Sequence, residues 1–301
     1  MLLILTLALC IVLFSACSPS TDDASMEQKS RVSVDFSTFQ VEVEDMSRSS
    51  RTALSTAATR LSFAVFNSNG TLVEGTTIHQ EKTSGGTGFG TVELELFPDT
   101  YQMVAVAHNG DENADITSVS TLTLPGETFT DTFTKVQELK VEPNKDCSFT
   151  MSLNRITTAF ILKLKDAVLP SNLKEIKVVL NTSGFLLSQV NPKTLDIDLV
   201  TGLALKSLKF THTIPVATIP VEIPRSIEPL YFIANNSPAT VGVKATAYDT
   251  EGNEIISHTF DEVPLTPNKK TVAPGTFFQS STSGFFTITS DWDSDDQEIE
   301  Y

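Results

Sequence analysis

The stretch TVELELF, residues 91–97, alternates apolar and acidic side chains one residue at a time. Valine and leucine occupy every second position, and two glutamates stand between them. Successive side chains of a β-strand point to opposite faces of a sheet. The pattern therefore predicts a strand with one buried face and one face in water.

The same period of two recurs along most of the chain. It is seen in LSFAVF (61–66), AFILKLK (159–165) and TVGVKATAY (240–248). Turn-forming segments such as NSNG (67–70) and DTEGN (249–253) separate the apolar runs. Many short strands without a long amphipathic helix predict an all-β fold built of antiparallel β-sandwiches.

The chain begins with an uncharged apolar segment at residues 2–14. This segment is shorter than the roughly 20 residues that a membrane-spanning helix needs, so we interpret residues 1–16 as an export signal. Ser15 and Ala16 are the small residues that a signal peptidase prefers before its cleavage site. Followed by Cys17, they resemble a bacterial lipobox, which implies a lipidated Cys17 held in the outer membrane. The alternative is an ordinary secretory signal with an incidental cysteine.

Residues 17–59 form a polar, lipidated leader in this interpretation. Its acidic pair, Asp22 and Asp23, resembles the signal that sends Bacteroidetes lipoproteins to the outer face of the outer membrane. The rest of the chain is long enough for two domains of ordinary size. We predict an N-terminal β-sandwich over residues 60–153 and a C-terminal β-sandwich over residues 154–301.

Charge and cysteine content exclude several functions. The formal net charge is -16 and no basic cluster occurs, whereas nucleic-acid binding requires a positive surface. Once Cys17 is lipidated and the export signal is removed, Cys147 is the remaining cysteine, so no intramolecular disulfide is expected. Cys147 follows the alternation of its segment and is interpreted as a small buried strand residue.

We find no motif that indicates catalysis, a metal or a cofactor. None of the four histidines stands at metal-ligand spacing, and each is interpreted as a turn or strand-surface residue (His79, His108, His212 and His258). Motifs of nucleophilic hydrolases, zinc proteases and phosphate-binding loops are absent. The segment DWDSDDQE at 291–298 matches the first three ligands of an EF-hand loop, but Asp296 replaces the turn glycine. We therefore interpret it as a solvated acidic segment.

Five stretches together resemble the fimbrillins, the subunits and anchors of Bacteroidales type V pili. They are RLSFAVFNSNGTLVEG (60–75), LFPDTYQMVAVAHNG (96–110), NRITTAFILKLKDAV (154–168), VPLTPNKKTVAPGTFFQ (263–279) and FFTITSDW (285–292). Their order along the chain also resembles the family, including the near-terminal tryptophan. The resemblance implies two transthyretin-like β-sandwiches in tandem.

The resemblance also implies a mode of assembly with other fimbrial subunits. In the family, an arginine-specific protease removes the lipidated leader together with a strand, and a neighbouring subunit fills the resulting groove with a strand of its own. On this basis Arg48 and Arg51 are candidate processing sites. The segment VSVDFSTFQVEVE at 32–44 is the candidate plug strand, expected to cover the apolar residues of LSFAVF. The alternative is that both arginines are ordinary linker residues.

The leading interpretation is thus a structural subunit of surface fimbriae, without catalysis. Stalk, tip, anchor and accessory roles stay open. The acidic segment at the end of the sequence lacks the alternating apolar face of a donor strand, which favours an anchor, tip or accessory role over the stalk. The first alternative is a glycan-binding surface lipoprotein of an uptake system, which usually presents a row of exposed aromatic rings. One Trp and four Tyr, scattered along the chain, make such a row difficult to build. A β-sandwich hydrolase is the remaining alternative.

Overall fold

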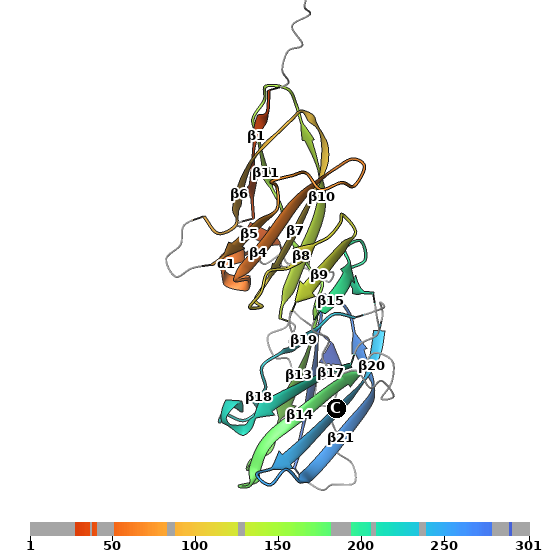
Figure 1. Ribbon diagram of the computed structural model, residues 1–301. Coiled ribbons are helices and arrows are strands. Elements are labelled where there is room, and N and C mark those ends of the chain that lie inside the picture. The colour runs from red at the N-terminus through yellow and green to blue at the C-terminus, as the bar shows by residue number, and fades with distance from the viewer. Residues whose placement is uncertain are drawn as a thin grey trace, which may run out of the picture.

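The computed structural model describes residues 28–36, 38–40, 51–82, 88–125, 130–181, 194–205, 209–234, 239–278 and 289–290. These residues contain 23 β-strands, one four-residue helix and one 3-10 helix. Figure 1 shows the strands gathered into two bodies, one after the other along the molecule. The all-β class and the two-sandwich architecture predicted from the period of two are therefore confirmed. Among the described helices, none has the length and apolar character that crossing a membrane requires.

The N-terminal body has three layers of sheet. In the first layer, β1 (Ser30–Asp35) lies between β6 (Thr91–Leu96) and β11 (Cys147–Thr150). The middle layer has the order β12-β10-β7-β4-β5, with bounds Asn154–Arg155, Thr132–Val141, Asp99–His108, Arg60–Asn67 and Ile78–Glu81. The third layer has the order β16-β15-β9-β8, with bounds Leu203–Ala204, Thr194–Asp198, Thr121–Pro125 and Asp115–Ile116.

The middle sheet is buried on both faces because β4 is apolar at consecutive positions. Leu61, Phe63 and Val65 belong to the core cluster shared with the first layer. Ala64 and Phe66 belong to the cluster shared with the third layer. An uninterrupted apolar run is typical of a strand covered on both sides.

The C-terminal body is a sandwich of two sheets. One sheet has the order β18-β13-β22-β23, with β19 also paired to β13; the bounds are Arg225–Ser226, Thr158–Leu164, Lys270–Gly275, Thr289–Ser290 and, for β19, Leu230–Phe232. The other has the order β17-β14-β20-β21, with bounds Lys209–Pro215, Leu173–Asn181, Ala239–Asp249 and Glu254–Leu265. The 3-10 helix η1 (Val216–Thr218) follows β17.

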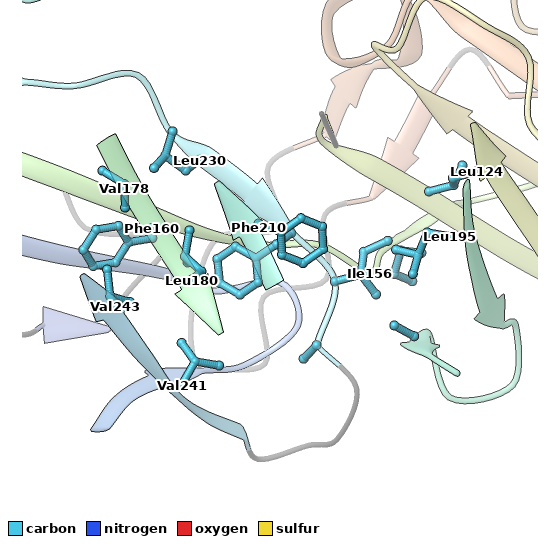
Figure 2. Packing of buried hydrophobic residues seen from close by; sticks show 14 of the residues in the cluster. Leu124, Ile156, Phe160, Val178, Leu180, Leu195, Phe210, Leu230, Val241 and Val243 are labelled. Carbon is cyan, nitrogen blue, oxygen red and sulfur yellow. The ribbon is translucent and has the colours of Figure 1, made fainter. Parts of the chain in front are cut away.

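The two halves of the chain share one sheet. Strand β15 comes from the C-terminal half of the sequence and pairs antiparallel with β9 of the N-terminal half, with Leu195 opposite Leu124. Figure 2 shows both leucines and Ile156 continuing the apolar cluster that fills the C-terminal sandwich. The division between residues 153 and 154 stays a prediction, and a short segment from beyond it completes the third layer.

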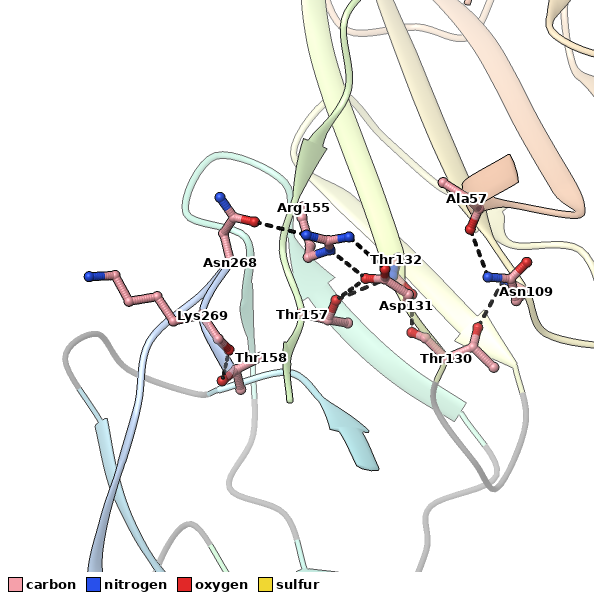
Figure 3. Close-up of polar contacts among 10 residues, drawn as sticks. All are labelled: Ala57, Asn109, Thr130, Asp131, Thr132, Arg155, Thr157, Thr158, Asn268 and Lys269. Atoms are coloured by element: carbon pink, nitrogen blue, oxygen red, sulfur yellow. Dashed lines mark hydrogen bonds and ion pairs between the residues drawn. The ribbon is translucent and has the colours of Figure 1, made fainter. Parts of the chain in front are cut away.

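Polar contacts fix the chain where the two bodies meet (Figure 3). Arg155 forms two hydrogen bonds with the carboxylate of Asp131, at 2.8 and 2.9 Å. Thr157 donates a third hydrogen bond to the same carboxylate at 2.8 Å, and Arg155 also donates to the Asn268 side chain at 3.2 Å. The Arg155 and Asp131 side chains are 9% and 10% exposed, so this ion pair is nearly removed from water.

Two of the strand pairings in the described part of the chain are parallel, whereas the sequence pattern predicted antiparallel sandwiches. The first joins β1 to β11, and the second joins β13 to β22. Alternating side chains report which face of a strand is buried, but they do not report the direction of its neighbour. The remaining described pairings between strands are antiparallel.

Candidate functional site

The leader strand β1 is the part of the predicted plug segment that the structure describes most fully. It pairs antiparallel with β6, with Val32 opposite Leu94, and parallel with β11, with Val34 opposite Phe149. It is therefore the middle strand of the first layer. We call the space between β6 and β11 that β1 occupies the slot.

The apolar face of the leader strand is fully buried. Val32, Val34 and Phe36 are each 0% exposed. They pack in one cluster with Phe63 and its neighbours on β4, and the rings of Phe36 and Phe63 meet edge-on with their centroids 5.9 Å apart. Residues 32–36 thus cover the apolar residues of LSFAVF as expected, but the predicted plug strand does not continue through the rest of the segment, because Thr38–Gln40 pair with Arg51–Ala53 in a separate two-stranded sheet.

Backbone hydrogen bonds continue past the end of β1. The Phe36 amide donates to the Gly90 carbonyl at 2.7 Å, and the Met151 amide donates to the Asp35 carbonyl at 3.0 Å. Gly90 has φ 93°, a conformation that residues with a side chain rarely adopt. These contacts fix the register of the leader strand at its C-terminal end.

Polar and charged contacts fix the other end of the leader strand. Ser30 Oγ donates to the Glu142 carbonyl at 3.0 Å, and the Arg31 amide donates to an Asp146 carboxylate oxygen at 3.0 Å. The Arg31 guanidinium lies 2.6 Å from the Glu93 carboxylate, with both side chains more than half exposed. Glu93, and more weakly Asp146 and Glu95, raise the pKa of Arg31.

This arrangement makes the leader strand part of the N-terminal core. In the structure β6 and β11 are both partners of β1, so removing β1 would leave two strands without their common neighbour. Burying three such apolar side chains contributes roughly 5–9 kcal/mol, at 1.5–3 kcal/mol each. An open trough with unpaired strand edges binds an extended chain by β-augmentation or aggregates.

The structure describes only part of the proposed processing machinery. Arg51 is the first residue of β3 (Arg51–Ala53), which pairs with β2 (Thr38–Gln40) and leads into α1 (Leu54–Ala57). Cys17, Arg48 and the export signal lie outside the described residues, as does the acidic segment at 291–298. Their roles remain predictions.

One of the four histidines differs from its interpretation as a surface residue. His108, at the end of β7, is only 3% exposed, and burial, followed by the charge of Arg60, lowers its pKa to about 4. Its Nδ1 accepts a hydrogen bond from the Gly110 amide at 3.0 Å, while its Nε2 is buried without a hydrogen-bond partner. His108 is a constituent of the middle sheet.

The other histidines lie on strands. His79 Nδ1 is 2.9 Å from Ser62 Oγ, and His258 Nε2 is 2.8 Å from the Phe277 carbonyl oxygen. His212 lies on β17, where burial lowers its pKa. Within the described part of the chain, no three His, Cys, Asp or Glu side chains are arranged to bind a metal ion.

Cys147 lies on β11 directly beside the leader strand. It is partly buried, and its Sγ is 3.9 Å from the Arg31 carbonyl oxygen. Burial, and next the charge of Asp146, raises the pKa of the thiol. A less ionised thiol is less nucleophilic, which fits a packing role, although Cys147 is only partly buried and not fully buried as the alternation of its segment predicted.

Sequence reasoning missed two charged contacts that the structure brings together. One is Arg31 at the entrance of the slot, and the other is the Asp131–Arg155 pair at the junction of the bodies. The partners of each pair lie far apart in the sequence. Local charge patterns therefore gave no indication of either contact.

Comparison with known proteins identifies the sequence family and the fold. The profile of a family described as "Family of unknown function (DUF6562)" matches residues 24–301. No curated protein matches the chain.

Solved structures resemble the chain at low sequence identity. A proposed polysaccharide-binding protein (DUF1812) from Bacteroides thetaiotaomicron has 11% identity and a TM-score of 0.50, over 86% of this chain and 97% of that chain. A proposed cell adhesion protein from Bacteroides uniformis has 10% identity and a TM-score of 0.50, over 90% and 99%. The fimbrial anchor protein Mfa2 from Porphyromonas gingivalis has 12% identity and a TM-score of 0.48, over 87% and 97%. At such low identities, the likeness to the proposed polysaccharide-binding protein and to the proposed cell adhesion protein shows a similar fold and nothing further.

Proposed function

Because the chain belongs to DUF6562, a family of unknown function, we propose its role from its slot and its fold: it is a structural subunit of surface fimbriae. The leader strand is a temporary occupant of the slot. Removing it opens the slot to a strand of another subunit. The observation that carries the proposal is the position of β1 as the middle strand of the first layer. This strand precedes both candidate processing sites, Arg48 and Arg51, in the sequence.

The fold comparison supports the same role. The proposed cell adhesion protein from Bacteroides uniformis has a similar fold. We extend the surface location to this chain through the lipobox-like segment that ends at Cys17. In this proposal the lipid on Cys17 holds the leader, and through it the whole chain, in the outer membrane until the leader is cut.

Arginine-specific cleavage of the linker is the switch in this proposal. Arg48 and Arg51 both follow the leader strand in sequence and precede β4, the first strand of the middle sheet. A cut after either residue separates the leader strand covalently from β4 and the strands that follow it, although a cut after Arg51 falls inside the short strand β3. In this proposal a subunit that assembles through its slot loses its leader, whereas an anchor subunit that stays in the membrane would keep it.

The proposal is tested on cells by the state of the N-terminus. Cells are labelled with a fatty-acid analogue, and the protein recovered from their surface is sequenced from its N-terminus. We expect label on the wild-type chain and none on Cys17→Ala. Equal labelling of both chains would contradict the lipid anchor.

The polymerising role has its own test in the purified chain. The Cys17→Ser chain, which cannot be lipidated, is treated with an arginine-specific protease and its size is measured. Arg48→Gln combined with Arg51→Gln is the uncut control. We expect the cut chain to assemble with candidate partner subunits, and we expect the control chain not to assemble. A cut body that stays monomeric at high concentration with those partners would refute strand exchange.

The glycan-binding alternative retains one supporting observation, the fold likeness to the proposed polysaccharide-binding protein. In the described residues, however, Tyr101 is buried, and Tyr231 and Tyr248 are only partly exposed. Sugar-binding sheets of this kind present exposed aromatic rings in a row. Binding of the uncut chain to a panel of polysaccharides, unchanged by leader cleavage, would favour the alternative over the fimbrial role.

A further inference from the structure

The entrance of the slot is acidic, and the leader supplies the cation that it contains. Glu93 and Glu95 project from β6, and Asp146 immediately precedes β11. We call these three residues the acidic mouth. Arg31 lies directly opposite Glu95 in the strand register, contacts Glu93 at 2.6 Å and donates its amide proton to Asp146.

Two other cations near this end of the slot contact groups outside the acidic mouth. Lys145 is 2.8 Å from the Glu142 carboxylate, a residue outside the acidic mouth. Lys29 lies over the Phe97 ring, with its Nζ 5.2 Å from the ring centroid. Because Lys29 and Arg31 both belong to the leader, its removal takes two positive charges away from this end of the slot.

The emptied slot would therefore combine an apolar trough with uncompensated negative charge. The trough is the part of the core that Val32, Val34 and Phe36 now fill at alternate positions. In the register, Glu95 stands opposite Arg31, one residue before the first of these positions, and Glu93 stands opposite Ser33, between the first and the second. A strand that fits both features has a Lys or Arg followed by apolar residues at the first, third and fifth positions after it.

This chain has no second copy of that pattern near its acidic terminus. The alternating segment FFTITSDW at 285–292 runs into DSDDQEIE at 293–300. Neither stretch contains Lys or Arg. Like charges brought together at an interface oppose binding and thereby discriminate between partners.

We propose that the opened slot selects a strand from a different protein, with a Lys or Arg immediately before three alternating apolar residues, and rejects this chain's own acidic segment. The inference rests on the proposed function, because it assumes that the leader strand can be replaced. It goes further in naming the chemistry of the partner and in making assembly between unlike chains the expected mode. The acidic mouth determines which strand enters, and the apolar trough supplies most of the affinity.

The expected discrimination is moderate because the charges are exposed. Single surface ion pairs contribute little, and salt screens them. Reversing the charge of the strand replaces attraction by repulsion from three carboxylates, for which we expect about a tenfold loss of affinity. At 1 M salt the Debye length falls to about 3 Å, so the difference should largely disappear.

The test measures binding of fluorescent peptides to the Cys17→Ser chain after leader cleavage, with the released leader fragment removed in mild denaturant. The reference peptide has the sequence of residues 28–40. Its Arg31→Glu variant tests the acidic mouth, and its Val34→Asp variant tests the apolar trough. A fourth peptide has the sequence of residues 284–296. The Glu93→Arg chain is the reciprocal variant on the protein side.

We expect the reference peptide to bind, the Arg31→Glu peptide to bind about tenfold more weakly and the Val34→Asp peptide to fail. The Glu93→Arg chain should reduce or reverse the preference between the first two peptides. Equal binding of the reference and Arg31→Glu peptides, with failure of Val34→Asp, would overturn the charge rule and leave the slot intact. Tight binding of the 284–296 peptide would overturn the rejection of the chain's own segment. If no peptide binds, or Val34→Asp binds as well as the reference, the proposed function itself is wrong.

Discussion

Replacing Phe36 with alanine should destabilise the N-terminal sandwich strongly. The Phe36 side chain is 0% exposed, and its ring meets the Phe63 ring edge-on at a centroid distance of 5.9 Å. Truncating a fully buried phenylalanine costs about 3–5 kcal/mol, because its transfer free energy is lost and a cavity remains. We therefore expect the free energy of unfolding of this sandwich to fall by about that amount.

The assay is urea unfolding of the uncut Cys17→Ser chain, followed by far-ultraviolet circular dichroism. A lower midpoint with an unchanged slope would indicate a loss of stability and not a change in the unfolded state. Ser33→Ala is the matched control on the same strand, because Ser33 is not part of the buried core. Its effect should lie within about 0.5 kcal/mol of zero.

A double-mutant cycle separates the ring contact from simple burial. Phe36→Ala and Phe63→Ala should be non-additive by about 0.5–1.5 kcal/mol, the coupling typical of paired aromatic rings. If Phe36→Ala changed the stability no more than Ser33→Ala, the leader strand would not belong to the core. The seating of β1 on which the proposed function depends would then be refuted.

Three further outcomes follow from the described contacts. Arg155→Ala leaves the Asp131 carboxylate nearly buried without its cation and should lower the free energy of unfolding by about 3–5 kcal/mol. Replacing Arg155 by Met together with Asp131→Asn should recover much of the loss, and a double variant no more stable than Arg155→Ala would contradict the contact. The pKa of His108 is lowered from 6.5 to about 4 in the folded state, so between these pH values the unfolded state binds more protons than the folded state. The free energy of unfolding is therefore highest above pH 6.5 and should fall by about 3 kcal/mol as the pH falls to 4. His108→Gln should reduce this dependence of stability on pH. Removal of the leader strand should increase the rate at which a thiol reagent modifies Cys147, and an unchanged rate would argue that β1 does not cover it.

Much of the fold could be predicted because one face of most strands is buried. Alternation identified β6 in TVELELF and β1 in the leader, and both are strands in the structure. The segment LSFAVF of β4 was interpreted by the same alternation, but the structure buries both of its faces, because a third layer of sheet covers Ala64 and Phe66.

The arrangement of the strands could not be predicted in the same way. A periodic pattern is local, whereas the partner of a strand is set by the chain that folds beside it. The parallel pairing of β1 with β11 and the pairing of β15 with β9 join segments far apart in the sequence. Nothing in either strand indicates these partners.

The burial of His108 was within reach of the sequence. It ends the strand MVAVAH, in which Val104 and Val106 precede it at alternate positions. Continuing that alternation places His108 on the same face as the two valines, which the structure confirms as buried. The acidic mouth, in contrast, depends on the register of β1 against β6, which only the structure shows.

The order in which the chain is synthesised gives the slot a further consequence. Residues 30–35 emerge near the beginning of the chain, but their partners on β11 are made more than a hundred residues later. Domains tend to fold in the order of their synthesis, and contacts between distant segments form slowly because long loops must close first. Strand β1 is therefore made well before its second neighbour, β11. While the chain folds, the N-terminal body therefore passes through a stage in which β11 has not yet formed and the slot for β1 is incomplete.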